Sequence, residues 1–273
     1  MSAASDATSS DQPAPGSEIL RGLVQRILAF FDEMGEMVFF TGRMFQALFS
    51  PPYRVGQWIE QMEFVGVGST FIIAITGMFM GMVLVLESLW AFKTLRMEEM
   101  VGATVELFLA REMGPVIGGI ILAARAGAAI TTELGSMRVT EQIDALEAMA
   151  VRPMNYLVAP RVLATTTMLP CLTLLFNASG FAAAYAVFVF GQGYEDAVFW
   201  ARITHYIEIV DLTHGLWKAL WCGLVIGIIS TYQGYNAKGG ASGVGAATTR
   251  AVVYSCVSIL LLDYVVTALG VDI

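Results

Sequence analysis

Charged side chains inside apolar stretches are the residues of this sequence best placed to do chemistry. They are Glu87, Arg111, Glu112, Arg125, Lys218 and Asp263. A charge in hydrocarbon is costly unless it is paired or faces water, so each is a candidate for handling an ion or a substrate. Arg111 and Glu112 could equally join Lys218 and Asp263 in a neutralised network that only fixes how helices pack. Both interpretations require pairing, and only the functional one also requires access to water.

The charged segment from Glu133 to Pro153 lies between two apolar runs and is a second candidate. It predicts a short helix over about residues 139–150, with Thr140 as its cap, acids near its start and Pro153 beyond its end. The helical period puts the acids on one face and apolar side chains on the other: Glu141, Asp144 and Glu147 against Ile143, Leu146 and Met149. We expect the apolar face to pack on the chain and the acidic face to meet a partner. A helix that only lies on the membrane surface is the alternative.

The composition is typical of an integral membrane protein. Hydrophobic residues make up 56% of the chain, charged residues only 14%, and the mean hydropathy is +0.67. The net charge of −8 argues against a nucleic-acid partner, because binding to phosphates requires clustered basic residues. The cysteines lie in apolar runs without metal-ligand spacing, and His205 and His214 are predicted to be solvated or interfacial. We therefore expect no metal or other cofactor.

The sequence divides into three regions. Residues 1–17 are rich in Ser, Ala, Asp and Pro without a basic residue, which predicts a disordered tail and not a signal peptide. Residues 18–52 predict an amphipathic helix in the membrane interface, with breaks at Gly35 and Gly42 and an end at Pro51. A soluble helix that packs on a partner is the alternative for this region. Residues 53–273 form the predicted transmembrane domain.

The predicted fold is all-α, with the interfacial helix followed by about five transmembrane helices. A span needs about 20 apolar residues to cross the hydrocarbon layer. The apolar runs place these spans at about residues 64–90, 105–130, 162–190, 216–232 and 252–271. The short charged helix lies between the second and third spans. The segment YNAKGGASGVGAATTR between the last two spans predicts a polar loop.

Lysine and arginine are concentrated on one side of the predicted spans. That side holds Arg21, Arg26, Arg43, Arg54, Arg138, Arg152, Arg161, Lys238 and Arg250. The opposite loops hold Lys93, Arg96 and Arg202. Because positive residues remain on the cytoplasmic side, the amino terminus and the charged helix are predicted to be cytoplasmic and the carboxyl terminus to face outward.

The sequence shows no pattern typical of an enzyme or of a nucleotide site. The glycine-rich segment around Lys238 lacks the GxxxxGK[ST] pattern of a phosphate-binding loop, and no Ser/His/Asp set or carboxylate pair has suitable spacing. We expect a membrane protein without its own ATPase activity and without catalytic residues. Uphill movement of a substrate would then need a partner or an ion gradient, and the charged helix suits docking to a soluble ATPase.

Two stretches resemble a known family. The residues LAREMGPVIGGIILAARAGAAITTELGSMRVTEQIDALEAMAVRPMNYLVAPR look like the core signature of MlaE-type (YrbE-like) permeases, and GVGAATTRAVVYSCVSILLLDYVVTALG is similar to the carboxyl-terminal span of that family. The resemblance covers residues 18–273. It implies a homodimeric permease of an ABC-type system in the bacterial inner membrane that moves phospholipids or similar lipids. A cytoplasmic ATPase would bind the ATP, an MCE-class protein would bind lipid on the periplasmic side, and a small cytoplasmic accessory subunit is a further partner.

The resemblance also implies roles for individual positions. The ATPase-coupling helix would comprise Thr140, Glu141, Gln142, Ile143, Asp144, Ala145, Leu146 and Glu147. An intramembrane charged cluster would comprise Arg111, Glu112, Lys218, Arg250 and Asp263. The lipid would contact Leu84, Ala91, Phe92, Leu95 and Met113, which are apolar as acyl chains require.

Two other functions remain open from the sequence. The first is an ion-driven secondary transporter of a hydrophobic substrate that uses Arg111, Glu112 and Asp263 as a relay, although no internal inverted repeat supports it. The second is a membrane scaffold that transports nothing.

Overall fold

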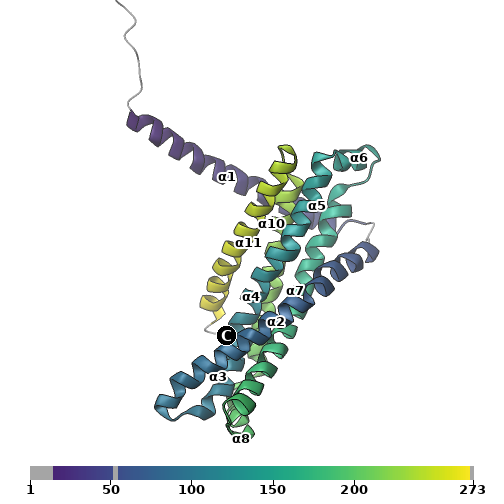
Figure 1. Ribbon diagram of the computed structural model, residues 1–273. Coiled ribbons are helices and arrows are strands. Elements are labelled where there is room, and N and C mark those ends of the chain that lie inside the picture. Colours follow the sequence, from purple (N-terminus) through teal and green to yellow (C-terminus); the bar gives the residue numbers. More distant parts are fainter. Residues whose placement is uncertain (1–14, 52–54, 271–273) are drawn as a thin grey trace, which may run out of the picture. The chain divides into compact units, whose positions relative to one another are not determined.

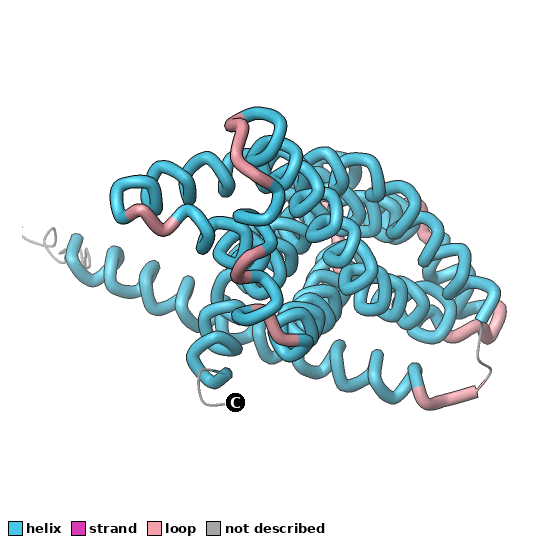
Figure 2. The backbone as a smooth tube through the Cα atoms, turned by 90° about the horizontal axis from the view of Figure 1, so that it is seen from below, coloured by secondary structure: helices cyan, strands magenta, loops and turns pink. Residues whose placement is uncertain are grey.

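Helices form all the regular structure in the part of the chain that the computed structural model describes, residues 15–51 and 55–270 (Figure 1 and Figure 2). The chain divides into two compact units, residues 1–42 and 43–273, and each is considered by itself. The second unit contains the membrane-spanning helices. We refer to it as the membrane domain.

α1 extends from Pro15 to Leu48 and passes through Gly35 and Gly42. The breaks predicted at these two glycines are therefore wrong. A glycine inside a helix costs only about 1 kcal/mol relative to alanine, which is too little to end a long helix by itself. Most of the tail predicted for residues 1–17 lies outside the described residues, although residues 15–17 belong to α1.

Five helical segments in the described part of the chain are long and apolar enough to cross a membrane. They are Val55–Leu95, Glu98–Val139, Met154–Gly191, Ile209–Tyr235 and Gly240–Leu269. The predicted number of spans is confirmed. Every segment begins earlier than the apolar run predicts, because the residues before each run are also helical.

The first, fourth and fifth spans are single helices, α2 (Val55–Leu95), α10 (Ile209–Tyr235) and α11 (Gly240–Gly270). The second contains the 3₁₀ turn Glu98–Met100, α3 (Val101–Phe108), the π turn Leu109–Met113, α4 (Gly114–Leu122), the π turn Ala123–Gly127 and α5 (Ala128–Val139). The third contains the π turn Met154–Val158, α7 (Ala159–Ala186) and the π turn Val187–Gly191. The short connecting helices are α6 (Gln142–Ala148), α8 (Asp196–Trp200) and α9 (Ile203–Tyr206).

The glycine-rich segment before the fifth span is mostly helical, so the polar loop predicted there is wrong. Only the turn around Gly239, which has a φ of 93°, separates α10 from α11. Val244 and Ala247 of α11 are buried together with Ala237. The Thr248 hydroxyl lies 2.9 Å from that of Thr132 on α5. Small side chains allow this close packing in lipid, and the packing stabilises a helix that composition alone would disfavour.

α7 lies at the centre of the membrane domain, between α2 and α10, and α11 packs on α5 and α10. The paired glycines of the spans serve this packing. Gly77 and Gly81 of α2 contact the Phe176–Gly180 region of α7, and at Gly81 the Gly180 carbonyl occupies the space that a Cβ atom would need. Gly223 and Gly227 of α10 contact α7 near Val162 and Thr165. These small residues let the backbones of α2 and α10 approach α7 closely.

The membrane domain has two distinct ends. α6 and the turn between α10 and α11 lie at one end, and α8 lies at the other, beside the end of α2 and the start of α3 (Figure 1). The charged segment and the Gly239 turn are therefore on the same side, as the distribution of basic residues predicts.

Candidate coupling helix and intramembrane charged cluster

α6 is bounded on both sides by residues in the left-handed region of backbone conformation. Glu141, immediately before it, has a φ of 57°, and Ala150, which follows it, has a φ of 59°. A residue with a Cβ atom occupies this region at a cost of about 1–2 kcal/mol. Such backbone strain persists only where surrounding contacts determine the fold, and it is concentrated at functional segments.

Thr140 does not cap α6, so this prediction is wrong. Its Oγ1 donates to the Ser136 carbonyl at 2.8 Å and accepts from Gln142 Nε2 at 3.0 Å. Thr140 ends α5, and Glu141 takes the N-cap position without a capping hydrogen bond from its side chain. The reason is that α5 continues to Val139, which leaves Thr140 in the turn that closes the preceding helix.

The predicted apolar face of α6 is confirmed at two of its three positions. Ile143 is fully buried in the main core, and Leu146 packs on the same core. Met149 is 65% exposed, so its predicted packing is wrong. Glu147 follows Ile143 by one helical turn and lies above it, whereas Met149 is rotated well away from that face. Ile143 and Leu146 therefore form the packed face of α6, and Glu147 remains exposed beside it.

Polar contacts tie α6 to two spans. The Tyr235 hydroxyl at the end of α10 donates to Glu147 Oε1 at 3.2 Å. Arg138 in the last turn of α5 donates to Asp144 Oδ1 at 2.6 Å, and its guanidinium lies 5.7 Å from the centre of the Tyr235 ring. The predicted coupling residues that remain exposed are Thr140, Glu141, Gln142, Asp144, Ala145 and Glu147.

Lys218 of α10 is the centre of an intramembrane charged cluster. Its side chain has no exposed surface, and its Nζ donates to Glu112 Oε2 and Asp263 Oδ1, both at 2.8 Å, and to Thr267 Oγ1 at 2.7 Å. An ammonium group has three N–H donors, so all of them are used. Glu112 lies in the π turn of the second span, and Asp263 and Thr267 lie in α11. The cluster therefore connects the second, fourth and fifth spans.

Arg111, which precedes Glu112 in the same π turn, forms a separate ion pair. Its Nη1 lies 3.4 Å from Asp211 Oδ1, in the first turn of α10. Neighbouring residues in a helical turn point in different directions, so Arg111 and Glu112 reach different residues of α10. Gly215 allows this approach, because the Ala110 carbonyl occupies the place of its missing Cβ atom. The predicted network is thus divided into two separate groups, Lys218 with its two carboxylates and Arg111 with Asp211.

Arg250 does not join the cluster. Its Nε donates to Gln233 Oε1 at 3.4 Å, near the end of α10 that lies beside α6. Asp263 is thirteen residues further along α11, which corresponds to about 20 Å of helix. The structure therefore separates Arg250 from the other residues predicted for the cluster.

The two remaining intramembrane charges have different environments. Arg125, in the second π turn, donates to the Phe64 carbonyl at 2.7 Å and to Ser69 Oγ at 3.3 Å, and its guanidinium lies 5.0 Å from the centre of the Phe64 ring. Arg125 therefore stabilises the contact with α2 by donating to a backbone carbonyl and a serine hydroxyl, and not to a carboxylate. The Glu87 side chain is exposed on α2 and has no hydrogen bond or ion pair among the described residues.

The predicted lipid-contacting residues divide into two groups. Leu84, Phe92 and Met113 are partly buried against the main core. Ala91 and Leu95 are exposed, and Leu95 retains 65% of its surface. All except Met113 belong to the C-terminal part of α2.

The structure adds polar pairs that the sequence analysis did not identify. Arg161 is only 4% exposed, and its Nη2 donates to Glu133 Oε1 of α5 at 2.8 Å. Glu133 begins the charged segment and Arg161 follows its end, and their opposite charges were the signal that could have identified the pair. His214, predicted to be solvated or interfacial, is partly buried, and its Nε2 has no partner in the described structure.

Comparison with known proteins places the chain in a family. A family model described as permease MlaE matches residues 58–269. A probable ABC transporter permease protein of Rickettsia felis is 38% identical over 92% of this chain and 97% of its own length. The intermembrane phospholipid transport system permease protein MlaE of Haemophilus influenzae is 34% identical over 92% of this chain and 96% of its own length.

A plant protein extends the range of relatives. The chloroplastic protein TRIGALACTOSYLDIACYLGLYCEROL 1 of Arabidopsis thaliana is 33% identical over 77% of this chain and 60% of its own length. The family match includes α6, Lys218 and both carboxylates that accept hydrogen bonds from Lys218. The chain therefore belongs to the MlaE family of ABC transporter permeases.

Proposed function

We propose that this permease moves phospholipids or similar lipids between the bacterial inner membrane and an MCE-class binding protein on the periplasmic side, driven by a separate cytoplasmic ATPase. The name of the Haemophilus relative, an intermembrane phospholipid transport system permease, supports this substrate class. The positive-inside distribution supports a cytoplasmic α6 and amino terminus. The functional unit in this proposal is a homodimer.

The observation that carries the proposal is the way α6 is exposed and anchored. Glu141, Gln142 and Ala145 are open to a partner, whereas Ile143 is fully buried in the core. A partner that displaces the exposed side of α6 must also move its buried side, because packed cores do not deform continuously. α6 therefore transmits a movement of a soluble partner to the membrane domain.

Two connections carry this movement into the spans. Arg138 is part of α5, which continues into the second span, and Tyr235 ends the fourth span. The second span also carries Glu112, which accepts from Lys218 of the fourth span. The coupling helix and the charged cluster thus act on the same pair of spans, although they lie at different depths.

The geometry of Lys218 supports a structural role for the charged cluster over an ion relay. Its ammonium is fully buried and makes hydrogen bonds with all three donors. All three donors are used by protein partners, and without this cation Glu112 and Asp263 would lose their shared counter-charge. The cluster therefore suits a fixed junction between spans that move together.

The decisive experiment is reconstitution of the permease with its ATPase in liposomes, followed by measurement of fluorescent phospholipid transfer to an acceptor. The variant Glu141→Lys with Gln142→Lys alters only exposed side chains of α6. We expect it to lose ATP-dependent transfer while ATPase activity persists and the permease stays folded in the membrane. Thr204→Lys, exposed beyond α8, is the matched control and should transfer normally.

The alternative functions give different results in the same assay. Transfer driven by a proton gradient without the ATPase would support a secondary transporter. Normal transfer by the Glu141→Lys and Gln142→Lys variant would remove the coupling role of α6.

A further inference from the structure

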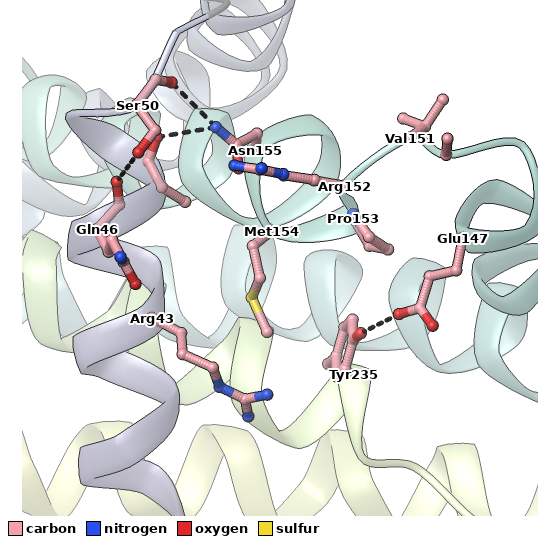
Figure 3. Close-up of a pocket in the computed structure, with 12 residues that line it drawn as sticks. Arg43, Gln46, Ser50, Glu147, Val151, Arg152, Pro153, Met154, Asn155 and Tyr235 are labelled. Atoms are coloured by element: carbon pink, nitrogen blue, oxygen red, sulfur yellow. Dashed lines mark hydrogen bonds between the residues drawn. The ribbon is translucent and has the colours of Figure 1, made fainter.

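A cavity of about 470 Å³ opens beside α6, on the side of the membrane domain that carries the charged segment (Figure 3). One wall is formed by Arg43, Gln46 and Ala47 at the end of α1 and by Ser50, which follows it. The opposite wall consists of residues 147–155 and Tyr235. None of these residues belongs to the charged cluster or to the predicted lipid contacts. The cavity borders the coupling helix, because Glu147 of α6 and its partner Tyr235 belong to its lining.

Two arginines give the cavity an excess of positive charge. Arg43 and Arg152 both line it, and neither side chain has a hydrogen bond or an ion pair among the described residues. Glu147 is the acid in the lining, and it already accepts a hydrogen bond from Tyr235. Two guanidinium groups with unused donors suit an anion that has several oxygen atoms, such as a phosphate group.

The wall between the arginines is fixed before any ligand binds. Asn155 Nδ2 donates to the Ala47 carbonyl at 3.0 Å and to the Ser50 carbonyl at 3.1 Å, and Ser50 Oγ donates to the Gln46 carbonyl at 2.7 Å (Figure 3). These bonds satisfy carbonyls at the end of α1 and hold that end against the start of the third span. A ligand would meet a preformed site, which lowers the cost of ordering it.

The surroundings of the cavity are those of a membrane interface. Phe45 lies on the face of α1 opposite Arg43 and Ala47, and Phe49, the residue after α1, is 75% exposed. Val55 and Ile59 at the start of α2 are 55% and 58% exposed. Exposed apolar side chains of this kind suit insertion into a lipid layer, and arginines beside them suit the level of the headgroups.

We propose that the Arg43–Arg152 cavity binds the headgroup of an anionic phospholipid from the leaflet on the α6 side. The phosphate lies between the two guanidinium groups, and the acyl chains leave the cavity beside the exposed apolar residues. Basic pockets at the ends of membrane helices recognise anionic headgroups in this way. The site requires only the membrane setting of the protein and not the proposed transport, so binding and transport are tested separately.

The test measures lipid retention by the full-length protein in detergent, using native mass spectrometry with added phosphatidylglycerol or phosphatidylcholine. We expect wild-type protein to retain phosphatidylglycerol in preference to phosphatidylcholine. The variant Arg43→Gln with Arg152→Gln should bind phosphatidylglycerol at least about 100-fold more weakly, the loss that two charge-assisted hydrogen bonds predict. Arg43→Lys with Arg152→Lys keeps the charge and should retain most of the binding.

Arg202→Gln is the matched control, since Arg202 lies at the other end of the membrane domain and pairs with Glu99 at 3.0 Å. It should bind phosphatidylglycerol as wild type does. The proposal is overturned if the glutamine variant retains phosphatidylglycerol, if wild type does not prefer it over phosphatidylcholine, or if inorganic phosphate displaces it at equal concentration. Loss of ATPase co-purification with unchanged lipid binding would instead assign the arginines to a protein contact and would also overturn it.

Discussion

The Tyr235 hydroxyl donates a hydrogen bond to Glu147 Oε1 at 3.2 Å and joins the last residue of α10 to α6. The same ring lies 5.7 Å from the Arg138 guanidinium of α5. One aromatic side chain is thus shared by α5, α6 and α10. A movement of α6 has a direct route into the second and fourth spans through this residue.

Tyr235→Phe removes the hydroxyl and keeps the ring over Arg138. We expect the free energy of unfolding to fall by about 1 kcal/mol, the net value of a hydrogen bond. Lipid transfer per ATP hydrolysed should fall further than this small loss of stability explains, because α6 loses its link to α10. Thermal unfolding and transfer in the reconstituted complex measure the two effects. Tyr206→Phe, which changes an exposed tyrosine at the other end, should leave both unchanged.

Asp144→Arg places a second cation beside Arg138, and we expect it to impair coupling between ATP hydrolysis and transfer. The exchange variant Arg138→Asp with Asp144→Arg restores the ion pair while it reverses the exposed charge. An exposed pair contributes at most about 1 kcal/mol, so both variants should fold. Recovery of transfer in the exchange variant would assign Asp144 to the internal pair. Continued loss would assign it to the ATPase contact.

Lys218→Met leaves Glu112 and Asp263 without their shared cation. Breaking a buried ion pair from one side costs about 3–5 kcal/mol, so we expect a large fall in melting temperature. Adding Glu112→Gln and Asp263→Asn removes the unpaired charges and should restore much of the stability. Thermal unfolding in detergent checks this order. A Lys218→Met variant as stable as wild type would contradict the burial and pairing of Lys218.

Arg250→Gln should change stability little, because its described contact is a 3.4 Å hydrogen bond to Gln233 on an exposed side chain. Combining Arg250→Gln with Asp263→Asn should give additive effects, since distant sites couple by less than about 0.5 kcal/mol. A double-mutant cycle from thermal unfolding measures this coupling. A larger coupling energy would place Arg250 with the cluster after all.

Gly81→Ala should destabilise the membrane domain, because the added Cβ atom meets the Gly180 carbonyl of α7. Overpacking of this kind costs about 1–3 kcal/mol. Gly56→Ala is the matched control on the same helix, where no atom lies within 4 Å of the added Cβ atom. Thermal unfolding should show a loss for the first variant and no loss for the second. Equal stability of the two would mean that α2 and α7 do not approach so closely.

Some of the site could be predicted from residue type and period. Lys218, Glu112 and Asp263 stood out because charges in apolar runs require partners, and the structure brings these three together. Ile143 and Leu146 were predicted from the helical period and are packed on the core. The predictions that Thr140 caps α6 and that Met149 packs on the core were wrong. The start of α6 depends on the left-handed turn at Glu141, which no local preference of glutamate predicts.

The sequence by itself determined the membrane class, the five spans and the family, because hydrophobic length and residue type are local properties that lipid selects directly. Tertiary structure alone decided which charges meet, since pairing depends on helix rotation and depth. It separated Arg250 from Lys218, paired Arg111 with Asp211, and turned the glycine-rich segment into helix by packing it on α5. It also brought Arg43 and Arg152, more than a hundred residues apart, to one cavity.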